Sequence, residues 1–333
     1  MNTEHKIDFV IPWVDGNDPE WIKAFDTYID KSDSMDASYE RYRSWDNLEY
    51  WFRSVEKFAP WVHKIHFITW GHVPKWMNIH HPKLNIVKHE DYMIQDHLPV
   101  FNSHAIEVNL HKIEGLSERF VYFNDDTFIL NHLKPERFFK NGLPRDIAVG
   151  NIISFGGIEH IFVNNIAIIN KHFSKKLQIK SHFIKWFTPQ YGTHLLKTLC
   201  LLPWRQFSGF FDHHQAQAFL KETYRNVWDV ENEVLQLTSQ SKFRRHTDVS
   251  QYLFRYWQLV TGQFVPISIK DTRYLGLKSI IECKEASEMI RTQKYNLICL
   301  NDKFENDTEF YQAKTLIQNA FKTILPDKSS FEI

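Results

Sequence analysis

The sequence predicts an α/β fold with a parallel or mixed sheet. Short apolar runs alternate with segments whose apolar side chains recur at helical spacing, and this alternation is typical of strand–helix units. Polar clusters follow two of the apolar runs, at residues 124–126 and 301–302, where strands of such a sheet place their ligands. A chain of 333 residues is also long enough to bury a large core.

The individual elements follow from caps and periodicity. The first predicted strand covers residues 7–11, and Asp18 followed by Pro19 begins a helix. We then expect a helix over 46–58, strands over 64–70 and 84–88, a helix from Ser103 to about Ile113, and a strand over 120–123. Later in the chain, the spacing predicts helices over 215–224, 227–237 and 248–259, strands over 264–269 and 297–300, and a helix over 308–324.

Residues 160–211 differ from the rest of the chain, because they contain no Asp or Glu and seven basic residues interleaved with Phe and Trp. This mixture suits an anionic membrane surface or a phosphate-rich acceptor, and it also suits single-stranded nucleic acid. The alternative is a helical segment whose lysines are merely solvated. We therefore expect an α/β core over 1–159 and 212–333 and a helical, basic and aromatic insertion over 160–211 that contacts membrane or acceptor.

Composition narrows the class of protein. The 40 basic and 40 acidic residues balance, so global charge gives no reason to expect nucleic acid. The three cysteines, Cys200, Cys283 and Cys299, have no metal or disulfide spacing, which fits a reducing compartment. The sequence shows neither a signal peptide nor an apolar run of the roughly 18 residues that span a bilayer. The expected location is the cytoplasm or the cytoplasmic face of the membrane.

The strongest chemical signal is Asn124-Asp125-Asp126 at the end of the predicted strand over 120–123. Two adjacent carboxylates repel each other, and a divalent cation such as Mg²⁺ removes that conflict. The alternative is that these residues only cap a turn, as Asn-Asp clusters often do. Asn301-Asp302 repeats the pattern at a second strand end.

Two other clusters add polar groups where packing does not demand them. Residues 13–18 form a glycine-containing turn before a helix, where backbone amides favour an anion such as a phosphate. Asp212-His213-His214 and Arg244-Arg245-His246 offer a base near neutral pH and a ligand for phosphate oxygens. The alternative is that the second cluster lies at exposed helix termini, where His and Arg are common.

Four blocks in this order resemble a known family. They are residues 7–21 (IDFVIPWVDGNDPEW), residues 53–126 with RSVEKFAPW, VPKW, FNSHAIE and HKIEGLSERFVYFNDD, residues 243–249 (FRRHTDV) with His214, and residues 299–302 (CLND). They resemble the Stealth family of sugar-phosphate transferases, which includes bacterial capsular polysaccharide phosphotransferases and, more remotely, the lysosomal-enzyme GlcNAc-1-phosphotransferase.

The resemblance implies a glycosyltransferase-like Rossmann core, a UDP-sugar donor, a divalent metal (Mg²⁺ or Mn²⁺), and a glycan acceptor that grows on a membrane lipid. It places Asp126, His214 and Arg244 at catalytic positions and Asp125, Asp126 and Asp302 at the metal. The implied donor contacts are Trp13, Val14, Asp15, Gly16, Asn17 and Asp18, with Arg41, Asn102, Ser103, Asn124 and Asn301. The reaction implied is transfer of hexose 1-phosphate to a hydroxyl with loss of UMP.

Metal, arginine and base form a sufficient set for phosphoryl transfer, which needs mainly positioning and electrostatics. In this hypothesis His214 accepts the proton of the acceptor hydroxyl, with Asp126 as the alternative base. Two other functions stay open. One is a metal-dependent glycosyltransferase that releases UDP. The other is a binding module without chemistry, docked on membrane or nucleic acid, although paired carboxylates would repel both surfaces.

Overall fold

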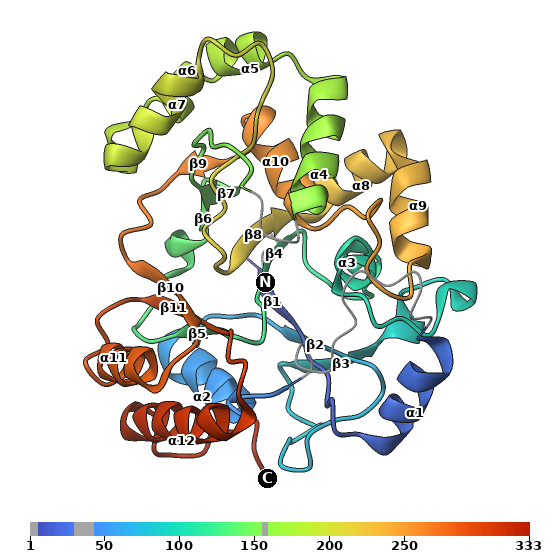
Figure 1. The fold of residues 1–333 in the computed structure, drawn as a ribbon, viewed down its shortest axis with the longest axis vertical. Coiled ribbons are helices and arrows are strands. Elements are labelled where there is room, and N and C mark those ends of the chain that lie inside the picture. The colour runs from blue at the N-terminus through green and yellow to red at the C-terminus, as the bar shows by residue number, and fades with distance from the viewer. Residues whose placement is uncertain (1–5, 30–42, 155–158) are drawn as a thin grey trace.

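A computed structural model describes residues 6–29, 43–154 and 159–333. Within these ranges the central sheet has the strand order β3 (Leu84–Lys88), β2 (Ile65–Thr69), β1 (Ile7–Pro12), β4 (Arg119–Tyr122) and β8 (Gln217–Leu220). The first four strands are parallel and β8 is antiparallel to β4. The sheet is therefore mixed and the fold is α/β, as predicted (Figure 1).

Two smaller sheets flank the central one in the described part of the chain. One has the order β10 (Thr272–Leu277), β11 (Leu297–Asp302) and β5 (Thr127–Ile129), with β10 parallel and β5 antiparallel to β11. The other joins β6 (Phe139–Lys140), β7 (Leu143–Asp146) and β9 (Val265–Pro266). Because β5 begins at Thr127, directly after the Asp pair, its pairing with β11 joins the two predicted Asn-Asp strand ends.

The described helices cover both faces of the central sheet (Figure 1). Their bounds are α1 (Pro19–Tyr28), α2 (Leu48–Phe58), α3 (Ser103–Glu107), α4 (Glu159–His172), α5 (Lys175–Ser181), α6 (Phe183–Trp186), α7 (Leu195–Leu201), α8 (Lys221–Val230), α9 (Asn232–Gln240), α10 (Tyr252–Val260), α11 (Ile280–Arg291) and α12 (Asp307–Ile324). Among them, none is both long and apolar enough to cross a membrane.

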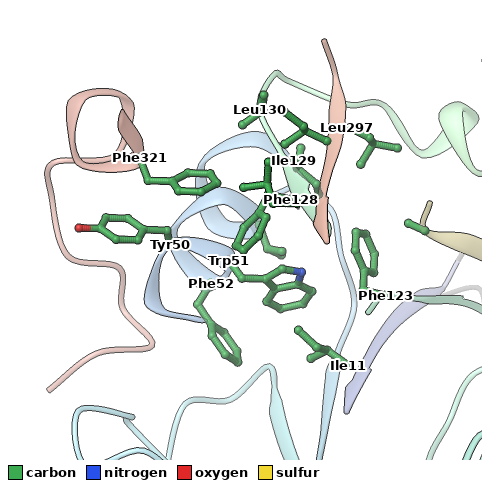
Figure 2. Packing of buried hydrophobic residues seen from close by; sticks show 14 of the residues in the cluster. Ile11, Tyr50, Trp51, Phe52, Phe123, Phe128, Ile129, Leu130, Leu297 and Phe321 are labelled. Carbon is green, nitrogen blue, oxygen red and sulfur yellow. The ribbon is translucent and has the colours of Figure 1, made fainter. Parts of the chain in front are cut away.

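The core divides at the central sheet because side chains alternate along each strand. Phe9 and Ile11 of β1 enter a cluster with α2, α11 and α12, whereas Val10 enters a cluster with α3, α8 and α10. Figure 2 shows Trp51 of α2 among Ile11, Phe123 and Phe128 in the first cluster. Each large apolar side chain buried in this way stabilises the fold by about 1.5–3 kcal/mol.

Four predicted elements are wrong. The helix expected over 227–237 is interrupted at Glu231, where α8 ends and α9 begins. The helix expected over 215–224 begins instead with strand β8, because pairing with β4 overrides local propensity, and α8 follows. The helix expected from Ser103 to Ile113 ends at Glu107, and its N-cap is Asn102. The strand expected over 264–269 shrinks to Val265–Pro266, which pairs with the last two residues of β7, Arg145 and Asp146.

The segment 160–211 is helical, as expected, and its first helix belongs to the core. Helix α4 packs on α10 and contributes Ile166 and Ile169 to the second cluster. Helices α5, α6 and α7 follow as an arm at one end of the molecule's long axis (Figure 1). The division of the chain at 160 and 211 stays a prediction.

Candidate active site

A cavity of about 800 Å³ opens at the carboxyl ends of β1, β4 and β11. This is the edge at which α/β sheets place their ligands. The predicted residues that line it are Trp13, Val14, Ser103, Asn124, Asp125, Asp126, His214, Arg244, Asn301 and Asp302. The four sequence clusters, which are far apart along the chain, therefore meet in one place.

Strand pairing positions Asp126 at the centre of this cavity. The backbone amide of Leu300 donates to the Asp126 carbonyl at 2.9 Å, which fixes β11 against the residue. The side-chain amide of Asn301 then donates to Asp126 Oδ2 at 3.3 Å. The two Asn-Asp strand ends thus form one polar cluster, with β5 and β11 as its scaffold.

His214 faces the same carboxylate. Its Nε2 lies 3.8 Å from Asp126 Oδ2, and the side-chain amide of Asn124 lies 3.5 Å from that nitrogen. The backbone of His214 has φ = +42°, a left-handed conformation that non-glycine residues rarely adopt and that is common at functional sites. The His214 and Tyr274 rings also pack nearly perpendicular to each other, with 5.4 Å between their centroids.

A buried ion network holds the residues next to His214. The Arg255 guanidinium, which is fully buried, donates to Asp146 Oδ2 at 2.8 Å and to Asp212 Oδ1 at 2.6 Å. His213 Nε2 lies 3.6 Å from Asp146 Oδ1. Asp212 and His213 therefore anchor the segment, and only His214 of the Asp-His-His motif reaches the cavity.

The charges in the cavity are strongly coupled. Burial raises the pKa of Asp125 to about 7, with the neighbouring Asp126 charge adding to the effect. Burial alone would raise the pKa of Asp126 as well, but the hydrogen bonds and charge supplied by His214 and the bonds from Cys299 and Asn301 hold it below its usual value. Burial lowers the pKa of His214, yet Asp126 more than offsets this and raises it. Asp126 thus favours the protonated form of His214, and the neighbouring carboxyl group of Asp125 holds its own proton more readily.

Arg244 reaches the cavity from the segment that precedes α10. Its guanidinium donates to Ser103 Oγ at 3.1 Å, so the two predicted residues lie side by side. Asn102 lies behind them, fully buried, and its amide donates to Asp248 Oδ2 at 2.8 Å while its carbonyl oxygen caps α3. Asn102 therefore supports Ser103 and Arg244 and does not line the cavity.

The predicted cluster over residues 13–18 contributes only its first two residues to the cavity wall. Trp13 and Val14 line the cavity, whereas residues 15–18 lie outside its wall. The Asp18 carboxylate accepts from the amides of Glu20 and Trp21 at the start of α1, so it occupies donors that a phosphate would use there. Asp15 is held in turn, because its amide donates to His72 Nε2 at 2.8 Å.

Asp302 lines the cavity but is already paired. Arg43 Nε donates to Asp302 Oδ2 at 2.8 Å, and the amide of Phe304 donates to Oδ1 at 2.9 Å.

The predicted donor contact Arg41 lies outside the described residues. Sequence reasoning missed Arg43, which lines the cavity together with Lys303 and Tyr274. Arg43 lies two positions after Arg41, and Lys303 directly follows Asn301-Asp302, so proximity to predicted residues is a signal that could have found both.

The residues fit a divalent cation in part. Asp125 and Asp126 supply adjacent carboxylates, and among the described residues the Asp125 side chain has no hydrogen bond to another side chain that would neutralise it. Carboxylate oxygens are the ligands that Mg²⁺ and Mn²⁺ prefer. Potential ligand atoms of Asp126, His214 and Cys299 also lie within 4.8 Å of one another. That second set contains nitrogen and sulfur, which Mg²⁺ disfavours.

Comparison with known proteins gives a consistent result. Models described as Stealth protein conserved regions 1, 2 and 4 match residues 5–33, 41–146 and 288–333. Capsular polysaccharide phosphotransferase WcwK of Streptococcus pneumoniae is 42% identical over 336 residues, which cover 100% of this chain and 99% of the relative. Exopolysaccharide phosphotransferase cps2G of Lactiplantibacillus plantarum is 38% identical, over 98% of this chain and 96% of the relative.

Among solved structures, the galactosyltransferase LgtC with donor and acceptor sugar analogs covers 97% of this chain and 98% of its own, at 9% identity and a TM-score of 0.41. The matched regions confirm the first, second and fourth sequence blocks, and the assignment of residues 243–249 with His214 to the third block stays a prediction.

Proposed function

Because this chain belongs to the Stealth family and is a sugar-phosphate transferase, we propose that it moves hexose 1-phosphate from a UDP-sugar to a hydroxyl of a growing capsule or exopolysaccharide glycan. The observation that carries the proposal is the cavity in which a carboxylate pair, a histidine and arginines converge. Phosphoryl transfer needs these groups, namely a base, charge stabilisation and precise positioning.

In the proposed reaction the acceptor oxygen attacks the sugar-linked phosphorus of the donor. The bond from that phosphorus to the bridging oxygen breaks, and UMP leaves with the electron pair. His214 Nε2 takes the hydroxyl proton, and Asp126, 3.8 Å away, stabilises the imidazolium that forms. Asp126 itself is the alternative base. Arg244, positioned by Ser103, stabilises the charge on the reacting phosphoryl group.

Asp125 and Asp126 would hold a divalent cation, Mg²⁺ or Mn²⁺, which when bound would offset the charge of the donor diphosphate. Asp302 stays in the proposed set, although its carboxylate is shared with Arg43 and the Phe304 amide. If Arg43 keeps that carboxylate, Asp302 instead positions the arginine toward the donor phosphates. Asp302→Asn would separate these roles, because only a metal ligand would change the Mg²⁺ concentration needed for half-maximal activity.

We assign the donor to the part of the cavity bounded by Trp13, Val14, Ser103 and Asn301. An aromatic ring such as Trp13, which is fixed by stacking on Phe67 at 5.7 Å, can support a nucleobase face. The proposed acceptor is a glycan carried on a membrane lipid, and the proposed site of action is the cytoplasmic face.

The test is the identity of the released nucleotide. Incubation with a panel of UDP-sugars, Mg²⁺ and short oligosaccharide acceptors should release UMP and add hexose phosphate to the acceptor. Release of UDP would make the protein a conventional glycosyltransferase, and absence of any turnover or UDP binding would favour a binding module. His214→Ala should reduce turnover by about a hundredfold or more, whereas His80→Ala, at an exposed position outside the cavity, should leave it unchanged.

A further inference from the structure

The arm formed by residues 175–205 exposes an unusual amount of apolar surface. We call this segment, which contains α5, α6 and α7, the basic arm. Six of its apolar side chains are between 47% and 83% exposed: Leu177, Phe183, Ile184, Leu196, Leu199 and Trp204. Large apolar side chains that are exposed together on one segment of a protein often mark an interaction surface.

The charges of the arm have one sign. No acidic residue occurs between His160 and Phe211, so nothing within the segment neutralises its lysines. Lys176 and Lys180 on α5, Lys197 on α7, and Arg205 beyond it are all exposed. The arm therefore presents positive charge and apolar side chains on the same short helices.

Two further lysines of the arm hold its helices in place through hydrogen bonds to backbone carbonyl groups. Lys175, which is buried, donates to the carbonyl oxygens of Leu201 and Trp204 at 2.5 and 3.0 Å, so α5 is tied to the end of α7. Lys185 donates to the Gly262 carbonyl at 2.5 Å, which ties α6 to the turn after α10. The exposed side chains thus project from helices whose positions are fixed by these hydrogen bonds.

We propose that the basic arm binds an anionic membrane surface. Exposed Phe, Ile, Leu and Trp side chains on short helices enter the headgroup region, while lysines and arginines lie against anionic lipid headgroups. Single-stranded nucleic acid would use aromatic side chains for stacking, but four of the six exposed apolar side chains are aliphatic and cannot stack on bases. The absence of acidic groups over the whole segment selects a negatively charged surface.

The arm is connected directly to the active site. Ile161 and Phe162 at the start of α4 line the cavity, and the same helix runs to His172, three residues before the arm begins. At 1.5 Å per residue, this helical stretch is about 16 Å long. Binding through the arm would therefore keep the cavity within reach of a lipid-linked acceptor, in line with the proposed function.

Sedimentation with lipid vesicles tests the proposal. The full chain is mixed with vesicles of phosphatidylcholine containing about 30 mol% phosphatidylglycerol or with phosphatidylcholine alone. We expect binding to the anionic vesicles that weakens with added salt, because each exposed charge adds about a fivefold gain in affinity near such a surface. Binding that is equal on neutral vesicles, or no binding to either, would overturn the proposal.

Two variants locate the binding surface. Lys176→Gln combined with Lys180→Gln should weaken binding to anionic vesicles by about twenty-fivefold, and Ile184→Ser should weaken it by about tenfold or more. Ile281→Ser on α11, where the side chain is 70% exposed, and Lys284→Gln on the same helix are matched controls that should bind normally. Equal losses in the controls would contradict the assignment to the arm.

Two further measurements distinguish membrane binding from self-association and from the enzymatic reaction. Sedimentation without lipid should give a monomer-like value that Ile184→Ser leaves unchanged, and a dimer lost in that variant would overturn the proposal in favour of a second copy. Turnover on a soluble oligosaccharide should be the same in the arm variants and the unmodified protein. If the chain binds vesicles but releases no UMP, the proposed function fails and the membrane proposal stands.

Discussion

Removal of the buried Arg255 charge should cost far more stability than removal of an exposed arginine with the same geometry. Arg255 is fully buried and makes a bidentate pair with Asp146 at 2.8 and 2.9 Å, and a further bond to Asp212 at 2.6 Å. Arg255→Met leaves both carboxylates without a counter-charge. Breaking a buried pair in this way costs about 3–5 kcal/mol, a large part of the roughly 5–15 kcal/mol that stabilises a typical domain.

Arg225 provides the matched control. It also binds one carboxylate with two nitrogens, to Glu118 at 2.7 and 3.0 Å, but its side chain is 48% exposed and that of Glu118 is 60% exposed. Water and salt screen such a pair, so Arg225→Met should cost about 1 kcal/mol or less. The Arg255 and Arg225 pairs therefore differ in burial, whereas both consist of an arginine bound to a carboxylate through two nitrogens.

The assay is denaturant unfolding at about pH 7, followed by the fluorescence of the 11 tryptophans. The free energy of unfolding should fall by about 3–5 kcal/mol for Arg255→Met and by about 1 kcal/mol or less for Arg225→Met. Equal losses would refute the reasoning, because burial would then not decide the strength of the network. A small loss for Arg255→Met would show that the two carboxylates are relieved in another way, for example by taking up protons.

Three further predictions concern pH and backbone geometry. Burial raises the pKa of Asp212 to about 6, so the unmodified protein should lose stability as pH rises from about 4 to 6, and Asp212→Asn should remove that slope in denaturant titrations. Burial lowers the pKa of His89 to about 4, so this group stabilises the fold above pH 6.5 and loses that effect as pH falls toward 4. At 1.36 kcal/mol per pKa unit, the free energy of unfolding should fall by about 3 kcal/mol over this range. His89→Phe should be correspondingly less acid-sensitive, and identical pH profiles would contradict this. Gly262 has φ = +70°, and a Cβ at this position would lie 2.3 Å from an imidazole atom, whereas Gly115 has φ = +74° and a Cβ there would meet no atom within 4 Å. Gly262→Ala should therefore lower the melting temperature clearly more than Gly115→Ala. Equal shifts would show that the imidazole ring moves aside freely.

Strands β1 to β4 of the central sheet could be predicted because each is a short, mainly apolar segment. The expected strand over 84–88 has the bounds of β3, and the expected helix over 308–324 differs from α12 by one residue. Strand β8 could not be predicted in this way. Its residues Gln217–Leu220 are too few to show a period, and their conformation is set by pairing with β4, about 100 residues earlier.

Helix α11 was missed although the sequence contains a signal for it. Ser279 accepts from the amide of Glu282, and the Glu282 carboxylate accepts from the amide of Lys278, close to the Ser-x-x-Glu capping pattern. Strand β10 carried no such signal, because most of its residues are partly exposed and its sequence shows no alternation. The capping residues therefore predict α11, whereas nothing in the local sequence predicts β10.

The candidate site was predictable as a set of residue types but not as an arrangement. Asn124, Asp125 and Asp126 follow a strand, and strand ends meet at one edge of a sheet. Nothing in the sequence shows that His213 turns inward to Asp146 while His214 turns to Asp126, because a positive φ at His214 decides it. The ion pairs of Arg43 were likewise hidden, since its partners Asp302 and Asp307 lie about 260 positions away.

The pairing of β5 with β11 has a consequence for the order in which the protein matures. The bond between Asp126 and Asn301 spans 175 positions, and β5 has no ladder partner until residues 297–299 have been synthesised. Chains fold from the N-terminus as they leave the ribosome, at about 5–20 residues per second. The central strands β1 to β4 can therefore form while the carboxylate pair still lacks its partners. The enzyme therefore gains its active arrangement seconds after the strands β1 to β4 can pair, so a shortened chain that ends before β11 would be partly folded and inactive.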